Sequence, residues 1–357
     1  MPESQAPPDY RVYRTRPRLF GRRRGEESIL DELRSKPPGG GRTRRPITFW
    51  RVVKWVALAV LGWIALSVVL FLISAQVNQD QVSADAQAQL ASGGVGILKP
   101  QTTLVLGSDL RTKGTKEPGA STSGPSRSDS ILLIRTGGGH SARLSIPRDT
   151  VVDIPGHGRN KINAAYAFGG AALALETVKQ YLGIPVNHLF EVNFANFPDL
   201  IDAMGGINYT GGCVISLISG GNRNGGFTLR LHKGTTHIDG QQALALARTR
   251  HNLCNPAEND LTRARRQQQI LSAMKHRVFS PVGFLRLPLI SWNAPKALKT
   301  DMRGPALLSY AVGMAISGSP PPRVLTPSGA VTLPDGGAGL VVSDAEKQRE
   351  VRRFLTR

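Results

Sequence analysis

The sequence predicts an α/β domain, a central mixed β-sheet covered by helices on both faces, preceded by one transmembrane helix. Three observations support this fold class. A long uncharged stretch stands before the domain, and short apolar runs bounded by Gly, Pro or Ser then alternate with longer segments of helical pattern. The hydrophobic content of 40% in 357 residues is ordinary for a chain that buries a core. Interleaved strands and helices of this kind form a sheet with helices packed on it.

The first segment, residues 1–50, is rich in Arg, Pro and Gly and has no sustained apolar period, so we predict a disordered basic tail. The whole chain has a formal net charge of +20. A charge of this size implies an anionic partner: nucleic acid, a phospholipid surface or a phosphorylated substrate. Charge alone does not distinguish the three.

The second segment, residues 51–76, contains an uncharged stretch from Trp55 to Ala75. About twenty apolar residues suffice to cross the hydrocarbon core of a bilayer, so a transmembrane helix is predicted. A cleaved signal peptide is the alternative, but the preceding region is longer than a signal peptide's basic leader and favours an uncleaved anchor. Because Arg51, Lys54 and further arginines crowd the N-terminal side, we expect the tail in the cytoplasm and the rest outside the cell membrane.

The remaining chain divides into a polar helical stalk at 77–100, a catalytic domain at 101–280 and an extension at 281–357 that packs on this domain. Strands are predicted at 103–107, 130–135, 142–146 and 188–194, and helices at 170–182, 196–204, from Asp239, and from about 260 to 278. Asp239 and Gln242 have the spacing of a capping box.

The two cysteines, Cys213 and Cys254, both fall in the external part of the chain. Oxidising conditions there let thiols pair, so we predict a disulfide between them. Two unrelated buried thiols are the alternative.

Arginine and aspartate side chains follow or precede three predicted strands. The first strand leads into Asp109 and Arg111, and the second starts beside Arg127 and Asp129. The third strand ends in the pair Arg148-Asp149. Ligands of α/β folds bind beyond the ends of the strands, so these side chains are candidates for a binding site.

Two further sets of charged residues lie near residues 250 and 265. Arg248 and Arg250 are two apart, which on an extended segment sends both side chains to one face. On the helix that follows, a second set shares one face through its i, i+3, i+7 spacing, with one more arginine beside it. This set comprises Asp260, Arg263, Gln267 and the neighbouring Arg266.

Guanidinium groups gathered in one cleft are stable when an anion binds between them. Arginine matches phosphate oxygens bidentately, and two carboxylates such as Asp109 and Asp129 could hold Mg²⁺ together with phosphate oxygens and water. The pattern suits phosphoryl transfer, in which positioning and charge neutralisation dominate. The alternative for each single Arg-Asp pair is a surface salt bridge. The sequence lacks a phosphate-binding loop, a zinc-ligand spacing and a G-x-S-x-G motif.

Seven sequence blocks give the domain a specific resemblance. They are LVLGSDLR, RSDSILLI, LSIPRDTVVDIPG, KINAAYAFGG, DLIDAMGGI, DGQQALALARTRH and DLTRARRQQQIL, within roughly residues 101–280. On these blocks the chain resembles the LytR-CpsA-Psr family of cell-wall glycopolymer ligases. Ala247 departs from the pattern, since many members have an aromatic residue there.

The resemblance implies an external phosphotransferase that moves a glycopolymer from a polyprenyl pyrophosphate carrier to peptidoglycan, with Mg²⁺ near the pyrophosphate and an apolar cavity for the isoprenoid tail. It implies catalytic roles for Arg148, Asp149, Asp109 and Asp129, the last two next to the metal. It implies pyrophosphate binding by Arg111, Arg127, Arg148, Arg248, Arg250, Arg263, Arg266 and Gln267, with Asp260 in support. The group that deprotonates the acceptor hydroxyl is Asp149 or an aspartate near the metal. In an actinobacterial relative the donor would be arabinogalactan or a comparable polysaccharide.

Two alternative functions remain open. A phosphatase or pyrophosphatase acting on the same lipid would release free phosphate instead of linking a polymer. A membrane-bound transcriptional regulator would use the basic tail to bind DNA. The tail has charge but no helix-turn-helix pattern, so we expect no nucleic-acid partner.

Overall fold

The computed structural model describes residues 48–93, 98–108, 128–218, 221–222, 226–249, 251–258, 260–318, 320–321, 323–334 and 336–356. The chain forms two compact units, residues 1–57 and 58–357. Nearly all of the expected cytoplasmic tail lies outside the described residues.

An apolar helix of 29 residues, α2 (Phe49–Val77), opens the described part of the chain. It is long and apolar enough to cross a membrane, as the sequence predicts for residues 51–76. Within the second unit, one face of its C-terminal half is buried. Phe71 and Ala75 there share a core with Phe190, Leu307 and Tyr310.

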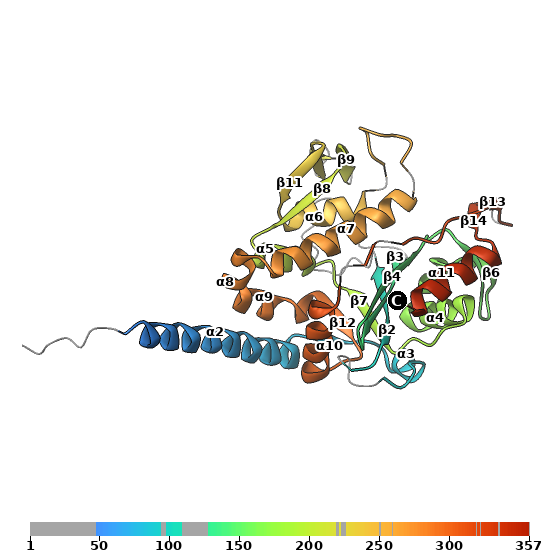
Figure 1. The fold of residues 1–357 in the computed structure, drawn as a ribbon. Helices are drawn as coiled ribbons and strands as arrows, with labels where there is room; N and C mark the ends of the chain where they lie inside the picture. Colours follow the sequence, from blue (N-terminus) through green and yellow to red (C-terminus); the bar gives the residue numbers. More distant parts are fainter. Residues whose placement is uncertain are drawn as a thin grey trace, which may run out of the picture. The chain divides into compact units, whose positions relative to one another are not determined.

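The centre of the second unit is a six-stranded sheet with the order β1-β12-β7-β2-β3-β4 (Figure 1). The strands are β1 (Asp80–Gln81), β12 (Leu298–Thr300), β7 (His188–Val192), β2 (Gln101–Ser108), β3 (Ser128–Gly137) and β4 (His140–Ile146). Strand β2 pairs in parallel with β7 and antiparallel with β3. The sheet is therefore mixed, which confirms the predicted fold class.

Helices cover both faces of this sheet (Figure 1). The helices are α3 (Ala84–Ala88), α4 (Ala164–Leu182) and α11 (Asp344–Thr356) on one face, and α7 (Asp260–Val278) and α10 (Gly304–Ile316) on the other. The alternation of the strands explains the two layers, because successive side chains point to opposite faces. On one face, Leu104 and Leu144 form the main hydrophobic core with Leu175 of α4. On the other face, the Arg143 side chain donates a hydrogen bond to Ser272 of α7.

A second hydrophobic core joins the remaining helices and hairpins between residues 192 and 297. The elements of this region are α5 (Phe197–Ala203), β8 (Ile207–Gly211), β9 (Val214–Ile218), β10 (Phe227–Leu231), β11 (Gly234–Ile238), α6 (Gly240–Arg248), α8 (Pro281–Leu285), α9 (Leu287–Asn293) and η2 (Pro295–Ala297). The capping box predicted at the start of α6 is present, since Asp239 and Gln242 exchange hydrogen bonds. The hairpins β9–β10 and β8–β11 were not predicted.

Two small hairpins complete the fold: β5 (Val151–Ile154) with β6 (Gly158–Lys161), and β13 (Gly329–Thr332) with β14 (Ala338–Val341). They meet through a bridge between Thr150 and Leu340. The β5–β6 hairpin directly follows β4 and leads into α4, so it fixes the chain where β4 leaves the sheet.

Two regions differ from the sequence-based expectation. In the described part of residues 77–100, expected to be a helical stalk, the helix that follows α2 is the five-residue α3, and β1 is an edge strand of the central sheet. The physical reason is that Val82 and Ala86 are buried in the main core, so this segment packs against the domain. In the extension after residue 280, β12 enters the central sheet between β1 and β7, and Phe354 of α11 joins the main core.

Candidate active site

The ends of three strands that adjoin predicted site residues lie at one edge of the central sheet. Because β2 and β4 run parallel and β3 runs antiparallel between them, the ends of β2 and β4 and the start of β3 share that edge. Gly107 pairs with Ser130, and Ile131 pairs with Ile146. The backbone thus brings these three strand ends together, while the expectation that their charged residues share one place stays a prediction.

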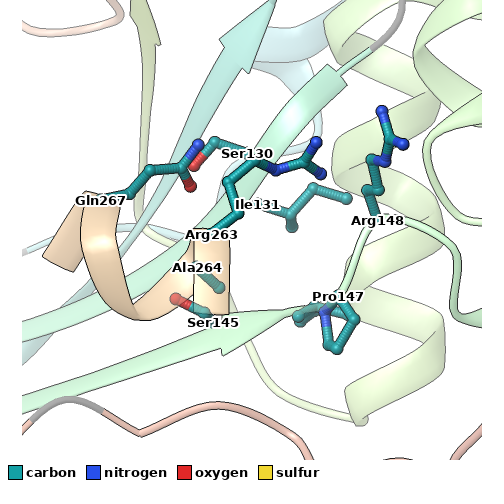
Figure 2. A pocket seen from close by; sticks show the side chains of 9 residues that line it. Ser130, Ile131, Ser145, Pro147, Arg148, Arg263, Ala264 and Gln267 are labelled. Atoms are coloured by element: carbon teal, nitrogen blue, oxygen red, sulfur yellow. The ribbon is translucent and has the colours of Figure 1, made fainter. Parts of the chain in front are cut away.

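A small pocket lies at this edge, between the sheet and helix α7 (Figure 2). It is lined by Ser130, Ile131, Ser145, Ile146, Pro147, Arg148, Arg263, Ala264 and Gln267. The Arg263 side chain reaches from α7 over Ile131 toward the side of the pocket where Arg148 extends, while the Gln267 amide lies beside Ser130 (Figure 2). The pocket has a volume of about 10 Å³, which is room for no more than about one water molecule. The isoprenoid cavity that the resemblance implies stays a prediction.

Asp149 lies between two cations just after β4. One carboxylate oxygen lies 3.4 Å from Arg148 Nε, and the other lies 3.8 Å from Lys161 Nζ. The backbone here is fixed, because the Thr150 hydroxyl donates to the Pro147 carbonyl at 2.7 Å. All three charged side chains are only partly exposed, at 20 to 26%, so their fields are less screened than those of surface ions.

Helix α7 is held on the sheet by a row of polar contacts. Gln268 Nε2 donates to Ser145 Oγ at 2.6 Å and to the Arg323 carbonyl at 2.9 Å. Gln267 Nε2 donates to the Ala247 carbonyl of α6 at 3.1 Å. Arg263 is only 4% exposed, so the helix delivers its guanidinium into a largely dehydrated place. Positive charge there binds an anion more strongly than it would in water.

Arg248, at the end of α6, reaches the same edge through an aromatic contact. Its guanidinium lies 4.9 Å from the centre of the Phe194 ring. Phe194 in turn packs on Gly107, where an added Cβ would stand 3.2 Å from the ring and 3.0 Å from the Cβ of Ser130. The glycine therefore lets the ring approach the strand that leads to Asp109.

Arg266 has different surroundings, although the sequence grouped it with Arg263. Its guanidinium is bonded to Glu258 and also donates to the Thr249 carbonyl at 3.4 Å. It is not among the residues that line the pocket. Burial raises the pKa of the Tyr209 phenol nearby, while Arg266 acts in the opposite direction. These contacts tie α7 to the end of α6.

Cys213 and Cys254 form a disulfide in the structure, as predicted, with their Cα atoms 5.9 Å apart. Asn252, which is 3% exposed, also links the two cysteines through hydrogen bonds. Its side-chain amide donates to the Cys213 carbonyl, and its side-chain oxygen accepts from the Cys254 backbone N–H. The disulfide and Asn252 together fix residues 252–254, which follow Arg248 and Arg250 in the chain.

Several predicted site residues lie outside the described part of the chain. These are Asp109, Arg111, Arg127 and Arg250, and also the side chains of Asp129 and Asp260, whose backbones belong to β3 and α7. Among the described residues, no group of three or more His, Cys, Asp or Glu side chains could hold a metal. Ser108 pairs with Ser128, so the strands bring the chain positions just before Asp109 and Asp129 together. Two carboxylates and phosphate oxygens suit Mg²⁺, which stays a prediction.

Sequence analysis missed two charged residues near this edge. Lys161, which faces Asp149, opens the block KINAAYAFGG, but its place depends on the β5–β6 hairpin, which returns the chain to residues 148–150. Glu191, near the end of β7, accepts a hydrogen bond of 2.6 Å from the Tyr166 hydroxyl. A carboxylate inside the predicted strand 188–194 was the available signal.

Comparisons with known proteins agree with this arrangement. Residues 69–321 match the LytR_cpsA_psr family. The chain is 35% identical over 207 residues to a polyisoprenyl-teichoic acid–peptidoglycan teichoic acid transferase, TagU of Enterococcus faecalis, covering 57% of this chain and 62% of the relative. It is 34% identical to TagT of Bacillus subtilis, covering 56% and 62%, and 31% identical to TagU of Bacillus mycoides, covering 65% and 71%. The chain thus spans somewhat less than two thirds of the first two relatives.

Solved structures show the same fold. B. subtilis TagV superposes with a TM-score of 0.56 at 29% identity, covering 72% of this chain and 96% of TagV. TagT bound to LIIa-WTA superposes with a TM-score of 0.57 at 25% identity, covering 77% and 97%. Because the family match extends over more than half of the sequence and includes every strand of the pocket, this chain belongs to the LytR_cpsA_psr family.

Proposed function

We propose that this protein is a phosphotransferase that moves a glycopolymer from a polyprenyl pyrophosphate carrier to peptidoglycan on the outer side of the cell membrane. The observation that carries the proposal is the meeting of Arg148 and Arg263, from distant parts of the chain, in one pocket beside Asp149. Two guanidinium forks at one place match the oxygens of a pyrophosphate. The names of the relatives support the same substrate class.

The reaction follows from these groups. The acceptor hydroxyl oxygen attacks the phosphorus that carries the glycopolymer, the bond from this phosphorus to the bridging oxygen breaks, and polyprenyl phosphate leaves. Arg148 and Arg263 neutralise the charge that builds on the phosphate oxygens. Asp149, held by Arg148 and Lys161, takes the acceptor proton. Mg²⁺ held by Asp109 and Asp129 would add positive charge at the pyrophosphate.

The proposed location follows from the anchor. Helix α2 spans the membrane once, and the basic residues before it keep the N-terminus in the cytoplasm. The disulfide supports an extracytoplasmic domain, because disulfides persist in oxidising compartments.

The donor polymer is a finer proposal. The relatives are named for teichoic acid, whereas the sequence led us to expect arabinogalactan or a comparable polysaccharide. Purified protein offered both donors in one competition assay would reveal the preferred one, and predominant teichoic acid transfer would overturn the arabinogalactan expectation.

The test of the proposed function uses full-length protein, a synthetic polyprenyl pyrophosphate donor and peptidoglycan, with linked polymer and free phosphate measured together. Arg148→Ala should lower the rate of linkage about a hundredfold, since one charge-stabilising donor is lost. Arg263→Lys should also lower it, because the charge remains but the fork does not. Arg230→Ala, on the exposed side of β10, is the matched control.

Two outcomes would contradict the proposal. Unchanged linkage in the Arg148 and Arg263 variants would remove the assigned site. Free phosphate without linked polymer would instead identify a phosphatase acting on the same lipid.

A further inference from the structure

An apolar segment, residues 279–293, runs alongside the anchor helix within the second compact unit. It contains α8 and α9 and follows directly on α7. Two hydrogen bonds fix it against α2. Trp63 Nε1 donates to the Phe284 carbonyl at 2.9 Å, and Ser74 Oγ donates to the Trp292 carbonyl at 2.6 Å. At 1.5 Å per residue, the two α2 residues are about 16 Å apart along the helix axis, so the segment runs in the same direction as α2 over that length.

The depth of Trp63 follows from the length of the apolar stretch. About twenty uncharged residues are needed to cross the hydrocarbon core, and the uncharged stretch of this chain starts at Trp55. If Trp63 lay outside the membrane, only residues 55–62 would remain to cross it, which is far too few. Trp63 therefore lies inside the hydrocarbon, and Phe284, bonded to it, lies at the same depth.

The outward surface of the segment has the composition that this depth requires. Large apolar side chains are left uncovered by the protein: Phe279 is 61% exposed, Leu285 69% and Leu289 53%, with Val282 and Phe284 close to 40%. A contiguous apolar patch of this kind is costly in water and marks a contact surface.

Polar groups in the segment, and Arg277 just before it, make hydrogen bonds within the protein. Arg277 donates from Nε to the Met204 carbonyl at 3.0 Å and from one terminal nitrogen to the Gly205 carbonyl at 2.7 Å. Arg286 donates to the Asp202 carbonyl at 3.4 Å. The start of α8 is capped by Ser280, whose hydroxyl accepts from the Gly283 amide at 3.1 Å. These polar groups thus bond within the protein, as polar groups that lie in lipid must.

The other end of the segment has interfacial residues. Lys296 Nζ lies 4.9 Å from the centre of the Trp292 ring, near the level of Ser74 at the outer end of α2. Tryptophan and lysine at this level are typical of the membrane–water boundary.

We propose that the apolar segment is a second membrane-contacting element, whose exposed face lies among the acyl chains next to α2. The inference rests on the proposed function only in that α2 spans the membrane with the domain outside. It seats the catalytic domain at a fixed depth in the bilayer in which a polyprenyl-linked donor resides.

The test uses the full chain in phosphatidylglycerol–phosphatidylethanolamine vesicles. Single cysteines replace Leu285 or Leu289 and receive an environment-sensitive fluorophore; the native cysteines stay bonded to each other. Quenching by nitroxide groups on the acyl chains is compared with quenching by aqueous iodide. Val69→Cys, on the exposed side of α2, reports the anchor, and Ala330→Cys, on the exposed side of β13, reports water.

Labels at 285 and 289 should behave like the label at 69, with acyl-chain quenching and several-fold less iodide quenching than the label at 330. Iodide quenching equal to that at 330, with position 69 still in lipid, would overturn the inference and leave the anchor intact. Iodide access at position 69 as well would overturn the membrane anchoring itself. If one leucine variant does not fold, Phe279→Cys supplies the second position.

Discussion

At the scale of single residues, Asp149 is the carboxylate that we propose for proton transfer. Arg148 and Lys161 each face one of its oxygens. Arg148 also lines the pocket together with Arg263, so the Asp149 carboxylate lies beside the proposed phosphate site.

Replacing Asp149 by Asn keeps the shape of the side chain but removes the base. We expect kcat to fall by about 10²–10⁴-fold with little change in the donor KM, and the acidic limb of the pH–rate profile to disappear. Asp153→Asn on the exposed side of β5 is the control. A kcat equal to that of the unaltered protein would assign proton transfer to another group.

Arg266 is expected to stabilise the fold. Arg266→Met removes the partner of Glu258 and leaves a partly buried carboxylate without its cation, since the Glu258 side chain is 15% exposed. Breaking such a pair costs about 3 kcal/mol of unfolding free energy. The double variant Arg266→Met with Glu258→Gln should recover part of this loss in chemical denaturation, and a variant as stable as the unaltered protein would contradict the role.

The sequence could predict part of the site for clear physical reasons. Helical spacing correctly put Arg263 and Gln267 on one face, because residues four apart lie on the same side of a helix. It could not separate Arg266 from Arg263, since the partner of Arg266 is Glu258, fixed by the loop before α7. Lys161 was missed because its contact with Asp149 depends on a hairpin with weak strand signals.

At the scale of elements, the disulfide closes a loop of 41 residues that contains the hairpin β9–β10, strand β11 and helix α6. In the chain-entropy model this closure stabilises the domain by about 4 kcal/mol. Replacing both cysteines by Ser should lower the melting temperature, and reduction of the unaltered protein should lower it equally. If reduction left the melting temperature unchanged, the cross-link would not constrain the unfolded chain.

The Glu350 carboxylate of helix α11 is held by two arginine side chains. Glu350 is 5% exposed and accepts from Arg353 at 2.7 Å and from Arg323 at 3.1 Å. Although burial acts to raise the pKa of Glu350, the hydrogen bonds from Arg353 and Arg323 prevail and hold it below its ordinary value of 4.5. A folded-state pKa below the unfolded one contributes stability that is present above pH 4.5 and is lost as the pH falls through the folded value.

Glu350→Gln should therefore reduce the unfolding free energy at neutral pH, and the difference from the unaltered protein should narrow as the pH falls below 4.5. Urea unfolding at a series of pH values measures this difference. Glu176→Gln, on α4 outside the arginine pairs, is the control, and a difference independent of pH would contradict the ionic role of Glu350.

Elements with strong local signals were predictable, and those that depend on distant partners were not. The apolar runs of β2, β3 and β4 and the capping box of α6 identified these elements. Strand β12 has only three residues and gains its partners from β7 and β1, far away in sequence. The hairpins β8–β11 and β9–β10 pack on α5 and α6, so burial against these helices determines them.

At the scale of the whole molecule, the sheet edge explains how residues so distant in sequence line one pocket. Strand order brings together the ends of β2 and β4 and the start of β3, and the polar contacts of α7 with the sheet add Arg263 and Gln267. The site therefore depends on the central sheet, and the second core between residues 192 and 297 positions Arg248 and the disulfide against it.

The most direct test of the central claim, that Arg148 and Arg263 bind one pyrophosphate together, is calorimetric titration of the full-length protein with geranyl pyrophosphate. The unaltered protein, Arg148→Ala, Arg263→Ala and the double variant form a thermodynamic cycle. Each single variant should weaken binding at least about tenfold, and the double variant should lose less than the sum of the two, since both side chains contact one ligand. Binding that is unchanged in either single variant, or losses that add fully, would contradict the claim.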